Sequence, residues 1–67
     1  MLQHEERVLQ EESELDTKIK ALINFFDTKT FQSLHATDQY LLSEQYKHMC
    51  DYLAVLKLRV SRFKKSN

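Results

Sequence analysis

The chain has 67 residues, no Gly, no Pro, one Cys and a formal net charge of zero. Because Gly adopts positive φ at the lowest cost, its absence argues against tight hairpin turns and phosphate-cradling loops, and favours an all-helical fold. A net charge of zero argues against nucleic-acid binding through bulk electrostatics. No apolar run approaches the roughly 20 residues of a membrane-spanning helix.

A chain this short needs a source of stability besides its own core, such as a disulfide, a metal or a partner subunit. The single Cys50 cannot close a disulfide within the chain, and His4, His35 and His48 lie too far apart for a zinc motif. We therefore expect one domain, residues 1–67, that forms a homo-oligomer. The N-terminus shows no signal-peptide pattern, and an unpaired Cys favours the cytoplasm.

The first predicted helix covers residues 3–26. Val8, Leu15 and Leu22 recur at intervals of seven, and Ile19 lies four residues after Leu15. This spacing places them on one side of a helix and predicts a narrow stripe that faces the core.

A connector is predicted at residues 27–36, where the apolar periodicity stops and Asp, Thr and Ser become frequent. Phe31 and Leu34 predict a short helical turn whose side chains plug one end of the fold. Thr37 is the predicted N-cap of the next helix, and a start near His35 is the competing choice.

The second long helix is predicted at residues 37–64, and its apolar surface is wider than one partner helix covers. This excess predicts self-association. Seven residues form the predicted oligomer interface: Leu42, Tyr46, Met49, Leu53, Leu56, Val60 and Phe63. The short connector makes the helices antiparallel neighbours. The predicted fold is therefore an all-α, antiparallel two-helix hairpin with a connecting helical turn, assembled as a homo-oligomeric bundle.

Charge is unevenly distributed. Residues 5–16 hold six acids against one base, and the last eleven residues hold five bases and no acid. An antiparallel hairpin lays these two segments side by side. Each exposed pair contributes only about 0.2–1 kcal/mol, so the charges set orientation more than stability.

Gln45, Tyr52 and Arg59 form a second heptad row on the long helix. In a structural interpretation they set register, with Arg59 paired to Glu5 or Glu12. In a functional interpretation they line a pocket between subunits, where a ring, an amide and a guanidinium suit a nucleotide. Both interpretations hold together if the pocket lies at the subunit interface.

Lys18 and Arg62 are lesser candidates for the same ligand site. No Ser/His/Asp set and no spaced carboxylate pair indicates catalysis. We expect no enzyme activity, no catalytic residue, no metal and no cofactor.

The chain resembles a family of small, mostly uncharacterised phage and prophage proteins catalogued as crAss-phage-related. The resemblance rests on Arg7-Val8, Glu11 to Leu15, Lys18-Ile19, Phe25, Phe31, Leu34, Asp38-Gln39, Leu41-Leu42, Gln45, Met49, Tyr52, Leu56 and Arg59-Val60. Family members often have Pro near the start of the second helix, where this chain has His35-Ala36. The resemblance implies a phage or prophage protein that acts in the cytoplasm of a bacterial host.

Some small helical phage proteins take up the cyclic nucleotides that serve bacterial immunity as alarm signals. By analogy of size, shape and origin, we expect sequestration of a cyclic or ADP-ribose-type nucleotide between subunits. The alternative is a module that blocks or bridges a host protein through the apolar face of the long helix. A nucleic-acid accessory role through the basic tail is a third, weaker hypothesis.

Overall fold

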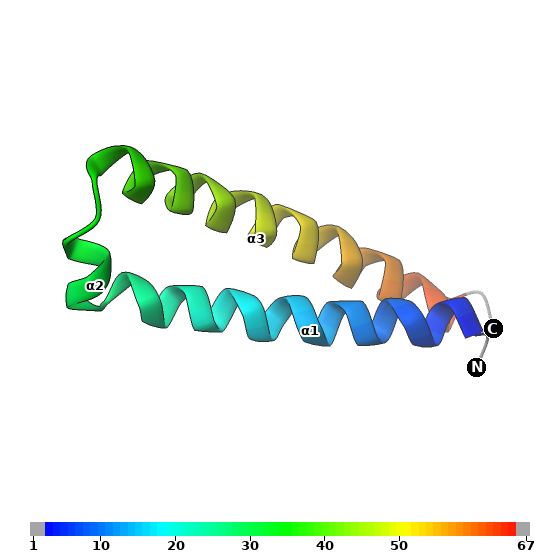
Figure 1. The fold of residues 1–67 in the computed structure, drawn as a ribbon. Helices are drawn as coiled ribbons and strands as arrows, with labels where there is room; N and C mark the ends of the chain where they lie inside the picture. Colours follow the sequence, from blue (N-terminus) through cyan, green and yellow to red (C-terminus); the bar gives the residue numbers. More distant parts are fainter. Residues whose placement is uncertain (1–2, 66–67) are drawn as a thin grey trace.

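The computed structural model describes the backbone of residues 3–65 and the side chains of residues 3–63. Its helices are α1 (Gln3–Phe26), α2 (Lys29–Gln32) and α3 (Ala36–Lys65), shown in Figure 1. No strand occurs within this range, so the prediction of an all-α fold is confirmed. The side chains of Lys64 and Lys65, part of the predicted basic tail, lie outside the described residues.

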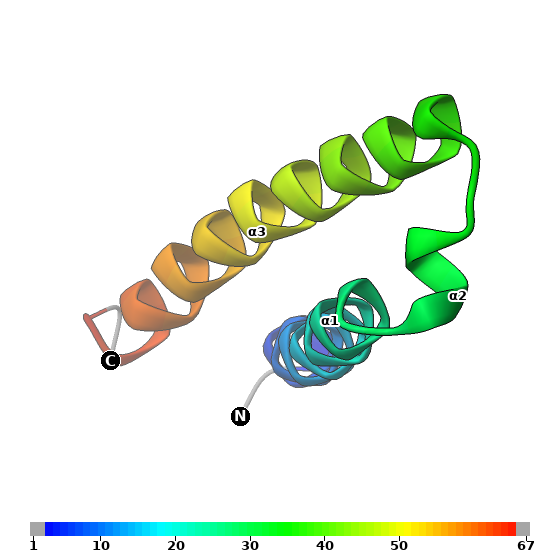
Figure 2. The same cartoon turned by 90° about the vertical axis from the view of Figure 1, so that its left-hand side faces the viewer.

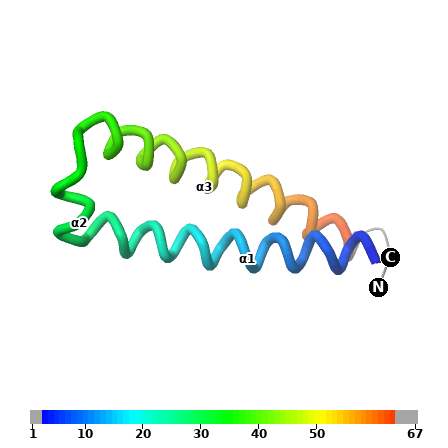
Figure 3. The backbone as a smooth tube through the Cα atoms, in the orientation of Figure 1, coloured from blue at the N-terminus to red at the C-terminus, as the bar shows by residue number. Residues whose placement is uncertain are grey.

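The two long helices lie alongside each other and run in opposite directions (Figure 1, Figure 3). They are close together where α1 begins and α3 ends, and they spread apart towards α2. Figure 2 looks nearly along α1 and shows α3 crossing it at an angle. The resulting body is elongated, with extents of 50 × 15 × 15 Å.

The Thr28 side chain fixes the break between α1 and α2. Its Oγ1 donates to the Phe25 carbonyl at 2.6 Å and accepts from the Phe31 N–H at 3.2 Å. Phe31 packs edge-on against Phe25 and Phe26, with ring centroids 5.9 and 5.0 Å away. Phe26 also contacts Tyr46 of α3 at 5.6 Å. These rings fill the wide end of the helix pair. Phe31 was predicted to plug one end of the fold, and it lies there.

Helix α3 begins at Ala36, one residue earlier than predicted, and His35 caps it. His35 Nδ1 accepts a hydrogen bond from the Thr37 N–H at 3.0 Å, and its carbonyl accepts from the Gln39 N–H at 3.0 Å. The Gln39 amide donates to the carbonyls of Phe31 and Gln32, which ties α3 to α2. Thr37 already lies inside the helix, so its prediction as the N-cap is wrong and the competing start near His35 is correct.

Five buried apolar side chains line the seam between α1 and α3: Val8, Leu15, Ile19, Leu53 and Leu56. The three from α1 belong to the stripe that the heptad spacing predicts. Leu56 is fully enclosed, with 0% exposure. The core is therefore a single narrow seam.

The residues predicted to form an interface between chains lie on the side of α3 that packs against α1. Leu56 has no exposed surface and Leu53 is buried, so neither has area to offer a second chain in this arrangement. The other five are half-buried: Leu42, Tyr46, Met49, Val60 and Phe63. An interface between chains that uses these residues stays a prediction.

Large apolar side chains remain exposed elsewhere on α3. Leu58 is 67% exposed, Leu41 56% and Val55 52%. The helix thus carries more apolar surface than α1 covers, as its sequence pattern predicts.

Two ion pairs lie within single helices. Lys20 and Asp16 approach to 2.9 Å on α1, and His48 and Glu44 to 3.8 Å on α3. Pairing between the acidic head and the basic tail stays a prediction. Within residues 3–65, no helix is both long enough and apolar enough to cross a lipid bilayer.

We predict that Leu56→Ala lowers the free energy of unfolding by about 2–5 kcal/mol, because it opens a cavity in the only full layer of the seam. Leu41→Ala is the matched control: the same truncation at a side chain that is 56% exposed should cost less than about 0.5 kcal/mol. Urea unfolding followed by circular dichroism measures both. Equal losses at the two positions would contradict the position of the core.

Candidate ligand-binding flank

Tyr52 connects the two long helices along one flank of the pair. Its hydroxyl donates a hydrogen bond to the Glu11 carboxylate of α1. The residue is nevertheless 44% exposed. The ring is therefore anchored at its hydroxyl and accessible from solvent.

Glu11 and Arg59 act on the pKa of Tyr52 in opposite directions. The hydrogen bond to Glu11 raises the pKa of Tyr52 above its usual value, and burial and the Glu11 charge act in the same direction. The positive charge of Arg59 acts in the opposite direction and lowers that pKa. Arg59 lies seven residues further along the same row of α3. Tyr52 and Arg59 therefore share one row of α3, about two helical turns apart.

The remaining candidates divide between this flank and another surface. Gln45 lies two turns from Tyr52 towards α2, is exposed, and donates weakly to the Met49 sulfur at 3.9 Å. Lys18 follows Glu11 by seven residues, so it lies on the same flank of α1, also exposed. Arg62 is exposed on α3 but lies outside this row.

We call Gln45, Tyr52, Arg59 and Lys18 the Tyr52 flank. A half-exposed ring can stack on a nucleobase, and an Arg fork can pair with a phosphate through two parallel hydrogen bonds. An amide can bind a base edge. The bond to Glu11 holds the Tyr52 ring in one orientation.

The other flank of the helix pair carries an open groove of about 340 Å³, lined by Leu9, Glu12, Ser13, Asp16 and Lys57. Lys57 lies about 140° around α3 from Tyr52, so the groove is separate from the Tyr52 flank. Glu12, one of the two acids proposed as a partner of Arg59, lines this groove.

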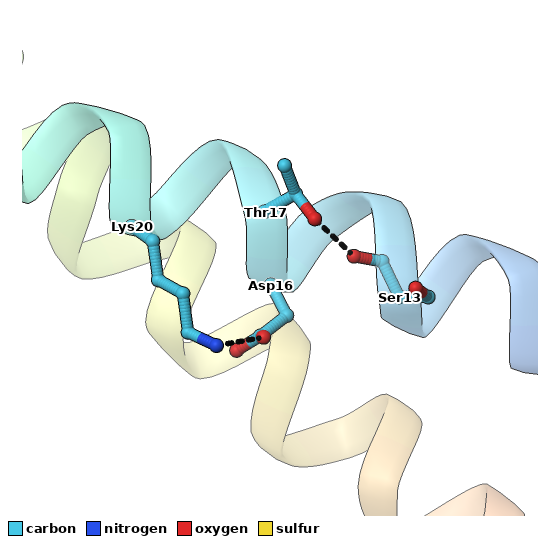
Figure 4. Close-up of polar contacts among 4 residues, drawn as sticks. All are labelled: Ser13, Asp16, Thr17 and Lys20. Carbon is cyan, nitrogen blue, oxygen red and sulfur yellow. Dashed lines mark hydrogen bonds and ion pairs between the residues drawn. The ribbon is translucent and has the colours of Figure 1, made fainter.

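Figure 4 shows the α1 wall of the groove. Asp16 is held by Lys20 at 2.9 Å, and Thr17 Oγ1 donates to the Ser13 carbonyl at 3.1 Å. Lys20 compensates the charge of Asp16, and Glu12 and Lys57 are the other charged residues of the groove lining. The groove therefore has no excess of positive charge to attract a phosphate.

Among the described residues, no group of three or more His, Cys, Asp or Glu side chains is placed to hold a metal ion. The free Cys50 is half-buried. Its hydrogen bond with Tyr46 raises the pKa of that phenol, and the charge of the thiolate and burial add to the effect. Tyr46 therefore stays protonated and serves as a packing residue at the wide end.

Comparison with known proteins gives the family. The Sequestin family model matches residues 2–62. The chain belongs to the Sequestin family. It is also 36% identical over 64 residues to the "Uncharacterized 7.5 kDa protein in denB-rIIB intergenic region" of Enterobacteria phage T4, a match that covers 96% of this chain and 100% of the relative. No solved structure matches.

The Sequestin match spans most of both long helices and all of the Tyr52 flank. Together with the T4 relative, it confirms the predicted likeness to small phage proteins.

From the sequence, Glu5 or Glu12 was the expected partner of Arg59. The acid that bonds Tyr52, Glu11, was not predicted. The signal was a matched spacing: Glu11 and Lys18 lie seven apart on α1, as Gln45 and Tyr52 do on α3. In an antiparallel pair, these two rows align along one flank.

We predict that Glu11→Gln lowers the pKa of Tyr52, because it removes the carboxylate that favours the protonated phenol. Since the folded-state pKa is raised, the stabilisation from this contact is complete below the unfolded value of about 10 and is lost as the pH rises through the folded value. Ultraviolet titration of tyrosinate measures the shift, with Tyr52→Phe identifying which transition is Tyr52. An unchanged titration in Glu11→Gln would contradict the assigned contact.

Proposed function

We propose that this Sequestin-family protein is a non-enzymatic binding protein that sequesters a nucleotide-type signal of bacterial immunity, in sites between copies of the chain. The observation that carries the proposal is the exposed Tyr52 ring, held at its hydroxyl by Glu11, with Arg59 seven residues further along the same row of α3. The family description, Sequestin, supports sequestration as the mode of action. Such a protein antagonises host defence by removing the signal before its receptor responds.

The chemistry of the flank fits cyclic and ADP-ribose-type nucleotides. The Tyr52 ring offers a stacking surface for a base, and Arg59 offers a bidentate partner for a phosphate. Gln45 can bind the edge of a base, and Lys18 adds a second positive charge on α1. Sequestration requires tight binding and no turnover, so a few fixed polar groups around an aromatic surface are sufficient.

The proposed setting is the cytoplasm of a bacterial host, where such signals are made and read. The T4 relative supports a phage origin. The narrower resemblance to the crAss-phage-related family stays a prediction.

A second candidate function is supported by the exposed apolar side chains of α3. Leu41, Val55 and Leu58 are each more than half exposed. Val55 and Leu58 are neighbours on the helix surface, and exposed apolar residues of this kind are typical of protein-binding sites. They support a role in blocking or bridging a host protein.

We predict that Arg59→Ala weakens nucleotide binding by about 10- to 100-fold, because hydrogen bonds to a charged group contribute about 1.5–3 kcal/mol. Arg59→Lys should recover only part of the affinity, since an ammonium lacks the fork geometry. Calorimetric titration with ADP-ribose, cyclic ADP-ribose and cyclic di-AMP measures binding, and circular dichroism checks the fold.

Lys47→Ala is the control for charge removal, because Lys47 is an exposed cation on α3 outside the Tyr52 flank. It should bind like the parent protein. Absence of binding by the parent protein across the whole panel would overturn the nucleotide proposal, and the protein-blocking function would then lead.

A further inference from the structure

One side of α3 faces away from α1 and is unused within the chain. We call it the outer face: residues spaced alternately four and three apart, namely Glu44, His48, Asp51, Val55, Leu58 and Arg62. Val55 and Leu58 are 52% and 67% exposed. Neither belongs to the core seam.

The charges on either side of these two apolar residues are opposite in sign. Asp51 lies four residues before Val55, and Arg62 lies four residues after Leu58. An antiparallel register that puts Val55 against the Leu58 of a second copy therefore also puts Asp51 against its Arg62. A parallel register would set Asp51 against Asp51 and Arg62 against Arg62. The outer face is thus complementary to itself in the antiparallel direction.

We propose that a second copy of this chain packs its α3 antiparallel against the outer face, about a two-fold axis, so that Tyr52 of each copy lies beside Arg59 of the other. The interface is inferred from the exposure of Val55 and Leu58 and from the opposite charges of Asp51 and Arg62. Its use as a nucleotide site rests on the proposed function.

The pairing of Tyr52 with the other copy's Arg59 follows from helix geometry. Tyr52 and Arg59 each come directly after an outer-face residue, Asp51 and Leu58, so their row lies between the outer face and α1. In an antiparallel helix pair, equivalent flanking rows meet each other. Seven residues, about 10 Å, separate Tyr52 from Arg59 in one chain. The two-fold axis reverses their order in the second copy.

The assembled site holds two rings and two guanidinium groups around the two-fold axis, on one face of the α3 pair and bordered by the two α1 helices. This arrangement suits a ligand with two phosphates and at least one base. Cyclic dinucleotides and ADP-ribose share that chemistry. We expect one ligand for every two chains.

The first test examines the interface without any ligand. In sedimentation experiments on the full chain, Asp51→Arg and Arg62→Asp should each raise the dissociation constant of the pair at least about tenfold, because each sets like charges against each other. The double variant should restore association. Lys29→Asp, an exposed reversal on α2, is the control and should leave association unchanged.

Leu58→Glu should separate the two copies while circular dichroism stays helical, and Ile23→Glu is its matched control. Ile23 is an exposed apolar residue of α1, at 45%. A monomeric parent protein, or single reversals that leave association intact, would overturn the interface. Failure of the double variant to recover would overturn the register.

The second test examines the shared site. Tyr52→Ala and Arg59→Ala chains are co-expressed with different affinity tags and purified through both, so that every pair is mixed. A mixed pair keeps one ring opposite one guanidinium and should bind ADP-ribose or cyclic di-AMP more tightly than either variant alone. Equal binding by the mixed pair and the single variants would overturn the shared site.

These outcomes separate the two proposals. If the double variant restores association but no nucleotide probe binds, the interface is retained and the nucleotide function is overturned. Nucleotide binding by a protein that stays monomeric would keep nucleotide sequestration and would overturn both the interface and the location of the site between copies.

Discussion

The rest of this structure depends on the small amount of apolar surface that α1 and α3 enclose. One fully enclosed side chain, Leu56, and four nearly enclosed neighbours make up the core. A helix pair joined along one seam has no second layer, so its remaining apolar residues stay at the surface. The elongated shape and the exposed outer face of α3 follow from this single constraint. Chains of this length bury a smaller fraction of their surface than larger domains do.

The Tyr52 side chain has two roles. Its hydroxyl bond to Glu11 joins the helices outside the apolar seam. The same bond fixes the ring on the flank where Arg59 lies. A side chain that contributes to register can therefore also present a prepared binding surface, and the structural and functional interpretations of the row are compatible.

Much of the fold could be predicted because its signals are periodic. The absence of Gly and Pro and the heptads of Val8, Leu15 and Leu56 specify helices and their buried sides. The start of α3 could not be predicted as well, since an imidazole acceptor at His35 is an uncommon cap. Periodicity also shows which residues share a face without showing which partner covers that face. Leu53 and Leu56, for example, were predicted at an interface between chains and are buried against α1. The acid that bonds Tyr52, Glu11, was not predicted.

The unequal spacing of the two long helices divides the molecule into regions of different local stability. At the narrow end, backbone opening must separate apolar side chains in direct contact. At the wide end, rings and a few capping hydrogen bonds hold α2 between the helices. Amide exchange should therefore be slowest around Leu56 and fastest around α2. Glu11 and Tyr52 join the helices away from the α2 end, so local opening around α2 leaves that contact in place.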